Sequence, residues 1–555
     1  MKKCYEGIAA AIAEETGAPM FGVMGDGNMS LWAAIAALGR NAIYSARHEA
    51  GAVAMADGYF RATGELGLAT VTCGPGLTQV GTSLMAAARN RSKIVVVTGE
   101  IPAGAKNKLQ VMDQRRFIEA CEARFVTVTS VDNAPDEIAE AFFLARQGSR
   151  PVVLNLPIDI QERSLEWEWD YRPSAGFVNT PKVAAEADLE RLAALLNEAE
   201  RPVIVAGRGA RVAGARDEIV ALADRAGALL ATSLQAKGLF ADHPYVIGIA
   251  GSYSAAPAEH LFQEADLILA VGAEFGYFTS EGGMLAPFAK VARIDVAPPP
   301  LEIGVVPGDY VRGDAKATAA ALLQKVEKKE GFRTKETRQF LASGGAGNPA
   351  EFGEHHPRHM LASLARVIPD NARLFCGGGH LIGFVAMHLA VPPDVDTQFS
   401  SQWGAVGQTI PVAVGMGAAT PDRPFIVIEG DGSVMMNLQE LETAARHQVQ
   451  MVVIIWNDGG FGAEVHKLAA KGLDGRLAQW PNPDFVAIAR AFGGDGELLA
   501  DPRDLGEAVE RGLRKKGLYL VEVRVSPLEK NDAYKKLYFG IPNAAPLIRR
   551  EEARL

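Results

Sequence analysis

Cysteine is scarce in this sequence of 555 residues, and its four copies follow no recognisable pattern. Cys4, Cys73, Cys121 and Cys376 are scattered along the chain, with neither the short spacing of a metal site nor a disulfide framework. Such a use of cysteine is typical of proteins in reducing compartments. We therefore expect a cytoplasmic protein in which each thiol is packed in the interior.

Long apolar runs and basic clusters are also absent. No run is long and apolar enough to span a membrane. Glu6, Glu14 and Glu15 interrupt the apolar start of the chain, which indicates an amphipathic helix rather than a signal peptide. The formal net charge is -10 and no basic block occurs, which argues against nucleic-acid binding. We expect neither a membrane nor a nucleic acid as a partner.

The length of the chain is too great for one hydrophobic core and favours three domains. We place them at residues 1–170, 183–330 and 357–555. A seam rich in Pro, Ser, Gly and Asn separates the first two, and a charged, then Gly/Ala/Ser-rich linker follows the second. Helical patterns alternate with short apolar runs throughout. This alternation predicts an α/β fold of three doubly wound parallel-sheet domains.

Short apolar runs mark the candidate strands of the first two domains. In the first domain they are Met20 to Met24, Ala42 to Ser45, Leu68 to Thr72, Lys93 to Thr98 and Val152 to Leu156. In the second they are Val203 to Ala206, Leu229 to Thr232, Leu267 to Val271 and Val291 to Asp295.

The stretch from 423 to 464 contains two apolar runs, each ending in a glycine-rich turn. The first run stops at the tetrapeptide GDGS, which contains Asp431, and the second stops at NDGG, which contains Asp458. Neighbouring parallel strands would place both turns at one edge of a sheet. Carboxylate oxygens, glycines and a helix N-terminus together suit a divalent cation that holds a diphosphate. Taken alone, the first turn also fits a helix cap by Asp431.

GDGS followed by an Asn-Asp pair resembles the signature of thiamine diphosphate enzymes of the acetolactate synthase, pyruvate decarboxylase and benzaldehyde lyase group. The resemblance implies a Mg²⁺ ion bound by Asp431, by Asp458 and by the main-chain carbonyl of Gly460. Asp458 departs from the asparagine that is usual in the family. The resemblance also implies cofactor contacts from the rest of these turns, namely Gly430, Gly432, Ser433, Phe461 and Gly462.

The segment Arg47-His48-Glu49, followed by AGAVAMADGYFRATG, resembles the activating-glutamate segment of the same family. The thiamine ring must lose a proton, and a carboxylate at N1' of the aminopyrimidine favours the tautomer that removes it. The resemblance gives Glu49 this catalytic and cofactor-binding role. The alternative is that Glu49 is only a first-turn carboxylate on the helix dipole. His48 would either line the active site or serve packing.

Two turns of the first domain resemble further family features. Gly74 opens a Gly-Pro-Gly turn and is expected at the cofactor. Gln110 matches the glutamine of a Phe-Gln pair that lines the active site of acetolactate synthases, although Leu109 replaces the aromatic residue. The alternative for Gln110 is a solvated loop side chain.

Two turns of the third domain complete the expected cofactor site. Gly379 and His380 end a glycine-rich turn after the strand Arg373 to Cys376, where backbone amides can approach a phosphate. By the family match, Gly404 offers its carbonyl to the cofactor's 4'-amino group, and Val406 supports the bent form of the cofactor.

The central domain carries only a weak nucleotide signal. Gly207 to Gly214 is a glycine-containing loop whose spacing departs from that of a dinucleotide fingerprint. Relatives hold FAD, ADP or nothing in this domain. Ala273 to Phe278 contains a glutamate and no arginine where acetolactate synthases carry arginines. FAD or ADP is therefore disfavoured, and a structural domain is the expectation.

Asp26 and Glu464 match active-site carboxylates of pyruvate and indolepyruvate decarboxylases. The paired histidines of those enzymes are missing, because no His occurs between His48 and His243. The pattern is therefore nearer to the carboligases of acetolactate synthase type. The alternative is that Asp26 caps the following helix and that Glu464 faces solvent.

The resemblance as a whole implies an enzyme, a lyase or transferase, that makes or breaks a carbon–carbon bond beside a carbonyl. We expect acetolactate synthase-like decarboxylation and carboligation of a 2-oxo acid or acyloin-type substrate. A simple 2-oxo acid decarboxylase, a 2-hydroxyacyl-CoA lyase and an oxalyl-CoA decarboxylase remain alternatives. A non-catalytic relative is a further alternative, against which the intact Glu49, Asp431 and Asp458 argue.

The first and third domains resemble two copies of one fold. In the family, the activating glutamate and the metal site meet across a subunit interface, which implies a homodimer or homotetramer. The tail that follows Ser526 is charged and aromatic, and it fits either a lid over the site or a surface wrap.

Overall fold

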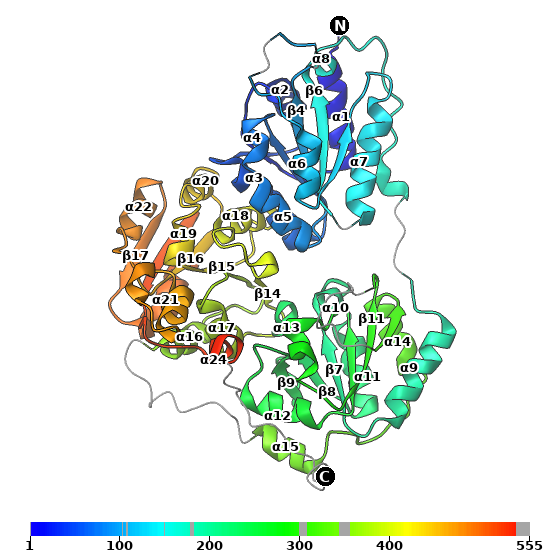
Figure 1. Ribbon diagram of the computed structural model, residues 1–555, viewed down its shortest axis with the longest axis vertical. Helices are drawn as coiled ribbons and strands as arrows, with labels where there is room; N and C mark the ends of the chain where they lie inside the picture. The colour runs from blue at the N-terminus through cyan, green and yellow to red at the C-terminus, as the bar shows by residue number, and fades with distance from the viewer. Residues whose placement is uncertain are drawn as a thin grey trace.

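The computed structural model describes residues 2–102, 104–106, 109–148, 150–177, 182–298, 308–342 and 356–539. Within these ranges the chain forms three parallel sheets of six strands each, with helices packed around them (Figure 1). Separate apolar clusters cover both faces of the sheets. The predicted α/β fold with three parallel-sheet domains is confirmed.

The sheet of the first domain has the strand order β2-β1-β3-β4-β6-β5. Its strands are β1 (Met20–Gly22), β2 (Ile43–Ser45), β3 (Gly67–Val71), β4 (Ile94–Glu100), β5 (Arg124–Thr127) and β6 (Val152–Pro157). Its helices are α1 (Cys4–Glu15), α2 (Met29–Leu38), α3 (Glu49–Thr63), α4 (Pro75–Thr78), α5 (Gly81–Arg89), α6 (Gln114–Ala120), α7 (Ala134–Gly148) and α8 (Ile158–Gln161).

The sheet of the third domain repeats this order as β14-β13-β15-β16-β18-β17. Its strands are β13 (Arg373–Cys376), β14 (Asp396–Phe399), β15 (Phe425–Gly430), β16 (Met451–Asn457), β17 (Asp495–Leu499) and β18 (Leu518–Arg524). Its helices are α16 (Pro357–Ala365), α17 (Leu381–His388), α18 (Thr409–Ala419), α19 (Asp431–Val434), α20 (Glu440–Arg446), α21 (Gly462–Ala470), α22 (Phe485–Ala491), α23 (Leu505–Arg514) and α24 (Asp532–Phe539). The two sheets therefore share one topology, as expected for two copies of one fold.

The middle domain has a different strand order, β12-β11-β10-β7-β8-β9. Its strands are β7 (Pro202–Ala206), β8 (Leu229–Thr232), β9 (Val246–Ile249), β10 (Leu267–Val271), β11 (Lys290–Asp295) and β12 (Asp309–Arg312). Its helices are α9 (Glu186–Glu198), α10 (Arg208–Val212), α11 (Arg216–Ala226), α12 (Ala256–Glu264), α13 (Tyr277–Ser280), α14 (Ala315–Leu323) and α15 (Lys335–Ala342).

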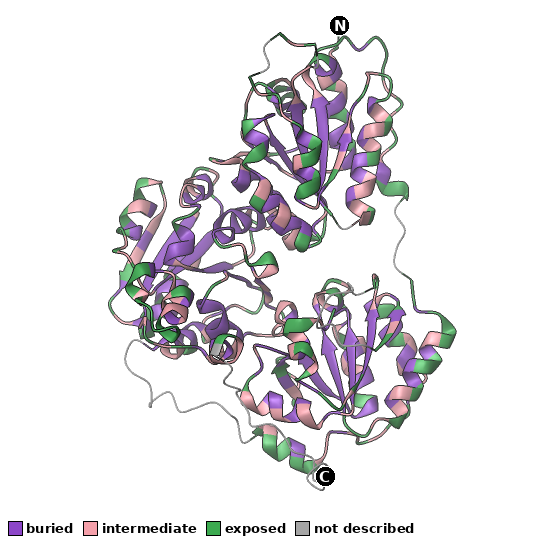
Figure 2. Cartoon of the chain, in the orientation of Figure 1, coloured by how far each residue is buried: buried purple, intermediate pink, exposed green. Residues whose placement is uncertain are grey.

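The first and third domains share one hydrophobic core, which contains residues of both sheets and of the helices between them. Figure 2 shows buried residues in the sheets and in the helices that face one another across this joint. Helices α3 and α18 cross there at close range. A Cβ atom on Gly58 would lie 2.0 Å from the carbonyl oxygen of Val412, and one on Gly415 would lie 1.9 Å from that of Met55. Glycine is required at both positions because the backbones touch.

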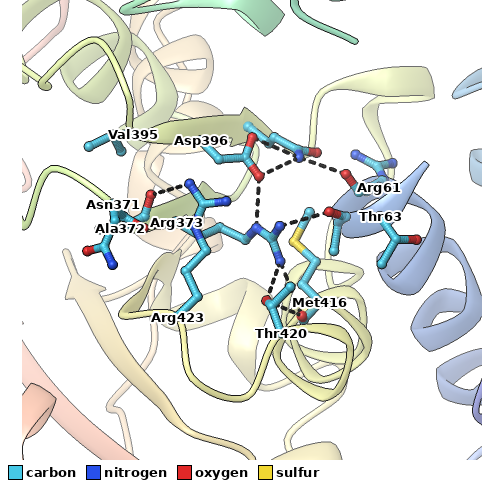
Figure 3. Close-up of polar contacts among 12 residues, drawn as sticks. Arg61, Thr63, Asn371, Ala372, Arg373, Val395, Asp396, Met416, Thr420 and Arg423 are labelled. Carbon is cyan, nitrogen blue, oxygen red and sulfur yellow. Dashed lines mark hydrogen bonds and ion pairs between the residues drawn. The ribbon is translucent and has the colours of Figure 1, made fainter. Parts of the chain in front are cut away.

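Arg373 also links the first and third domains where they pack together (Figure 3). Its guanidinium is buried and donates to Asp396 Oδ2 at 2.8 Å, to Thr420 Oγ1 at 2.8 Å and to the carbonyl oxygens of Met416 at 3.2 Å and Ala62 at 3.0 Å. The last carbonyls of a helix have no partner within the helix. One arginine thus satisfies carbonyls at the ends of α3 and α18, in two different domains.

Replacing Arg373 with Met should destabilise the chain by about 3–5 kcal/mol, because the change leaves Asp396 without its charged partner in a largely buried place. Urea unfolding measures the loss. Arg490→Met is the matched control, since that guanidinium is exposed and pairs with Asp495 at the surface, and it should change stability by less than about 1 kcal/mol. Equal effects of the two substitutions would contradict the role given to Arg373.

The four cysteines are unpaired and buried, as expected. Among the described residues, no helix has both the length and the apolar character needed to cross a membrane.

Candidate active site

The turns after β15 and β16 lie at one edge of the third sheet. The two strands are parallel neighbours, with Gly430 in register with Trp456. Asp431 is 1 % exposed and begins the short helix α19. Its Oδ2 accepts a hydrogen bond of 2.5 Å from Asn482, whereas its Oδ1 is buried and has no hydrogen-bond partner within the part of the chain that the structure describes. This geometry confirms the predicted proximity of the two turns.

Asp458 faces Asp431 from the second turn. Burial, and then the neighbouring Asp431 carboxylate, raise the pKa of Asp458 well above its ordinary value, and burial also raises the pKa of Asp431. Two carboxylates at close range, one buried and one partly buried, cannot both stay ionised unless a cation or a proton lies between them. The Asp431 oxygen without a hydrogen-bond partner and the pairing of Asp431 with Asp458 therefore fit a divalent cation.

The space beside the carboxyl pair is kept open by glycine. A Cβ atom on Gly462 would lie 2.2 Å from Asp458 Oδ2, and one on Gly460 would lie 2.2 Å from the carbonyl oxygen of Ala478. Within the described ranges, no group of three His, Cys, Asp or Glu side chains could hold a metal. A cation here would consequently combine the two carboxylates with main-chain or water oxygens.

Asn482 belongs to this site, although the sequence did not point to it. Its Nδ2 donates to Asp431 Oδ2 at 2.5 Å and to Asn457 Oδ1 at 2.9 Å, which ties the two turns together. Asn457 in turn donates to Glu522 Oε1 at 2.7 Å. Asn482 is separated from Asp458 by helix α21 and a loop, so its only sequence signal is a Pro-Asn-Pro turn, which is common in loops.

The turn that contains Gly404 and Val406 lies against the GDGS turn. The backbone N–H of Gly407 donates to Ser433 Oγ at 2.9 Å, and its carbonyl accepts from Asn437 Nδ2 at 2.6 Å. Gly404 has a φ of 67°, and the Val406 side chain is partly exposed. The structure thus brings Gly404, Val406 and Ser433 into the neighbourhood of Asp431.

Gly432 and Phe461 are adjacent. A Cβ atom on Gly432 would lie 2.8 Å from the Phe461 ring. The ring also packs edge-on against Trp480, with the ring centroids 4.8 Å apart. Both predicted cofactor-binding residues are therefore close to Asp431, where they shape one wall of the site.

His380 contacts the C-terminal segment. Its Nε2 accepts from the backbone N–H of Asn531 at 3.4 Å, and its carbonyl accepts from Asn531 Nδ2 at 2.6 Å. Burial lowers the pKa of His380 to about 3, and the His466 ring lies 4.6 Å away. His380 is therefore neutral near pH 7, and its Nε2 is engaged. Gly379, with a φ of 90° and open space at its Cβ position, remains available for close approach.

Helix α24 joins the third domain to the middle domain. Tyr534 packs against His380, and Lys467 lies 4.2 Å from the centroid of the Tyr538 ring. Lys536 forms ion pairs with Glu259 and Glu281 of the middle domain. Up to residue 539 the tail thus packs beside the turn that contains Gly379 and His380, and its remainder lies outside the described residues.

The first domain presents a second cluster at the edge of its own sheet. Glu49 is partly buried at the first position of α3, and a Cβ atom on Gly76 would lie 3.3 Å from its Oε1. His48 is the N-cap of the helix, since its Nδ1 accepts from the N–H of Ala50 at 3.1 Å. The structure thus supplies a helix-capping function for His48.

The Gly-Pro-Gly turn and Gln110 lie in the same region. Gly74 has a φ of 58°, and a Cβ atom on it would lie 2.6 Å from the carbonyl oxygen of Gln110. The Gln110 side chain accepts a hydrogen bond of 3.2 Å from the Cys73 thiol. Its side chain is therefore directed at the turn.

Asp26 and Glu464 are more exposed than their neighbours. Asp26 is exposed in the turn after β1, and the N-cap of the next helix is Asn28, so the helix-cap alternative for Asp26 is wrong. Glu464 lies in the first turn of α21, half exposed, with its Oε1 3.4 Å from Lys467 Nζ.

The glycine loop of the middle domain is explained by packing. A Cβ atom on Gly207 would lie 2.2 Å from the carbonyl oxygen of Gly272, and one on Gly209 would lie 2.8 Å from the Cα atom of Gly272. Arg208 donates to Asn90 Oδ1 at 2.6 Å and to the Asn90 carbonyl at 2.8 Å, which links the loop to the first domain. The glycines let two turns of the chain touch.

Comparison with known proteins identifies the class to which this fold and site belong. The chain matches the N-terminal TPP binding domain, the central domain and the C-terminal TPP binding domain of thiamine pyrophosphate enzymes over residues 2–118, 189–322 and 377–523. The chain belongs to this family of thiamine diphosphate-dependent enzymes.

Its relatives include acetolactate synthases and a decarboxylase. The chain is 30% identical to the acetolactate synthase isozyme 2 large subunit of Escherichia coli (strain K12), over 87% of this chain and 88% of that protein. It is 30% identical to the acetolactate synthase large subunit of Corynebacterium glutamicum, over 80% and 74%. It is 29% identical to the probable 2-ketoarginine decarboxylase AruI of Pseudomonas aeruginosa, over 91% of each.

Proposed function

We propose that this chain is a thiamine diphosphate- and Mg²⁺-dependent enzyme that decarboxylates a 2-oxo acid and joins the product to a second carbonyl, as acetolactate synthases do. The observation that carries the proposal is the pair of the buried Asp431 and the partly buried Asp458, at the edge where two glycine-rich turns meet, with one Asp431 oxygen that has no hydrogen-bond partner among the described residues. The unpaired, buried cysteines support a reducing, cytoplasmic location.

The proposed site residues form two clusters with different roles, one in the third domain and one in the first. Asp431, Asp458 and the carbonyl of Gly460 would hold Mg²⁺ and, through it, the diphosphate. Gly404 and Val406 would hold the aminopyrimidine. When bound, thiamine diphosphate supplies a nucleophilic carbon that adds to the 2-oxo acid and accepts the electron pair left by CO₂.

Glu49 would hold a proton at N1' of the aminopyrimidine. A carboxyl suits this task because it must share one proton with a ring nitrogen, and partial burial keeps water from competing for it. The backbone turn that begins at Gly74 lies beside it and would close this wall of the site.

A homodimer or homotetramer would complete the site. Exposed apolar side chains surround each cluster, and such patches mark surfaces that other chains or ligands cover. On the third domain they are Trp403, Val406, Met435 and Met436. On the first domain they are Met24, Met29, Leu109 and Val111. A second subunit that brings its first domain to this third domain would cover both sets.

A simple 2-oxo acid decarboxylase is the second candidate, favoured by the similarity to a probable 2-ketoarginine decarboxylase. The deciding experiment incubates the purified protein with thiamine diphosphate, Mg²⁺ and a panel of 2-oxo acids, with and without acceptor aldehydes or a second 2-oxo acid, and detects products by mass. Longer-chain 2-hydroxy ketone or acid products support carboligation, and aldehydes alone support the decarboxylase. Absence of turnover on every 2-oxo acid, with the cofactor bound, would contradict both.

Asp26→Asn and Glu464→Gln should each slow product release by about 10²-fold, because each removes a carboxyl that can move a proton at the substrate. Quenching with acid during turnover and measuring the cofactor-bound species by NMR should show accumulation after CO₂ has left. Exchange of the thiamine C2 proton should be unchanged. Wild-type rates in both variants would leave these two carboxyls without a catalytic role.

A further inference from the structure

The segment that precedes Glu49 is held by a helix of the third domain. Helix α20 lies beside α3 (Figure 1), and its first residue is Glu440. The Oε1 atom of Glu440 accepts hydrogen bonds from the backbone N–H groups of Arg47 at 3.2 Å and His48 at 3.0 Å. A side chain from one domain thus caps the start of the helix on which Glu49 lies in another.

Glu440 is completely buried and tightly enclosed. Its Oε2 accepts from Thr443 Oγ1 at 2.7 Å. A Cβ atom on Gly51 would lie 2.4 Å from Oε1, so glycine is needed in the first turn of α3 for the carboxyl to reach the backbone. A carboxylate only accepts hydrogen bonds, and its charge also complements the positive end of the helix dipole.

Three further contacts hold the same segment against α20. The Arg47 guanidinium forms a bidentate pair with Glu442, with Nε–Oε2 at 2.6 Å and Nη2–Oε1 at 2.7 Å. Arg446 donates to the carbonyl of Ser45 at 2.5 Å. The rings of Tyr44 and His447 lie 4.5 Å apart. The third domain therefore contacts residues 44, 45, 47 and 48, although the half-exposed Arg47–Glu442 pair contributes little to stability.

We propose that Glu440 is a positioning residue for the activating glutamate: by fixing the backbone of Arg47 and His48, it sets the place from which Glu49 reaches the cofactor. The inference deepens the proposed function and rests on the role given there to Glu49. Glu440 follows Asp431 closely in the chain, so one short stretch contains both a proposed metal ligand and the residue that caps the segment before Glu49.

The size of the effect follows from the geometry that catalysis requires. A displacement of about 1 Å in a reacting group costs about 10²-fold in rate. In Glu440→Gln the shape is kept, but an NH₂ group that cannot accept replaces one carboxylate oxygen and the charge is lost. In Glu440→Ala two partly buried N–H groups lose their acceptor.

The test compares Glu440→Gln and Glu440→Ala with Glu442→Gln, which removes the more exposed partner of Arg47, and with Glu49→Gln. The first measurement is hydrogen exchange of the Arg47 and His48 amides in the cofactor-free protein. Glu440→Ala removes the acceptor and should speed it about tenfold or more, Glu440→Gln keeps one neutral accepting oxygen and should speed it less, and Glu442→Gln should leave it near the wild-type rate.

The second measurement is exchange of the C2 proton of bound thiamine diphosphate, followed by NMR at saturating cofactor. Glu440→Ala should slow it about 10²-fold, with cofactor affinity within about threefold of wild type, Glu440→Gln should slow it less, and Glu442→Gln should leave it unchanged. Faster amide exchange with a wild-type C2 rate would overturn the inference and leave Glu440 a stabilising cap only. A wild-type C2 rate in Glu49→Gln would instead show that the function proposed for Glu49 is wrong.

Discussion

Asp431→Ala should abolish binding of both Mg²⁺ and thiamine diphosphate. Asp431 offers the site a buried carboxylate oxygen that has no hydrogen-bond partner among the described residues, and the diphosphate would be held chiefly through the metal. Loss of an outer-sphere partner alone weakens metal binding by about 10- to 100-fold, so loss of the ligand should cost at least about 100-fold. Calorimetric titration of thiamine diphosphate in the presence of Mg²⁺ measures the change.

Two further variants serve as comparisons for Asp431→Ala. Asp458→Asn should bind nearly as well as wild type, because the amide still offers a neutral oxygen and the repulsion with Asp431 is removed. Asp474→Asn changes an exposed carboxylate of the same domain, paired with Arg476 at the surface, and should have no effect. If Asp431→Ala binds the cofactor as tightly as wild type, the metal site lies elsewhere.

Glu49→Gln should stop the activation of bound cofactor without releasing it. A glutamine cannot share a proton with N1', so exchange of the C2 proton should fall by about 10⁴-fold, the upper end for a lost acid–base group. Binding of thiamine diphosphate and Mg²⁺ should persist, because Asp431 and Asp458 are on a different domain. NMR of the exchange, combined with calorimetry of binding, separates the two effects.

Glu65→Gln is the matched control for this prediction. Glu65 is exposed just beyond the C-terminal end of α3, so its replacement removes the same charge at the far end of that helix from Glu49. It should leave both exchange and binding at wild-type values. Unchanged exchange in Glu49→Gln would remove Glu49 from the chemistry.

The inner strands were predictable from sequence because they are continuous apolar runs. Leu229–Thr232 and Leu267–Val271 agree residue for residue with the expected strands. The strands that were missed in the first two domains, β5, β9 and β12, are all at sheet edges. Edge strands are half exposed and so lack an unbroken apolar run.

Within the site, the sequence determined the residues whose chemistry is tied to a local turn. Asp431 and Asp458 each follow a buried strand directly, and parallel neighbouring strands must end at the same edge. Glu49 was predicted because the segment around it, a His-Glu pair before a helix of small residues, resembles the activating-glutamate segment of the family. No tertiary information was needed to make these predictions.

Only the tertiary structure decided which side chains from distant segments support those turns. Asn482 bridges Asp431 and Asn457, and Glu440 caps the backbone before Glu49 across a domain boundary. His380, expected at the phosphate, has its Nε2 engaged by Asn531 of the tail. Each of these contacts depends on how whole domains and loops pack against one another. That packing is determined by the hydrophobic core that the first and third domains share and by the glycines that let their backbones touch. Local sequence patterns do not indicate such distant partners.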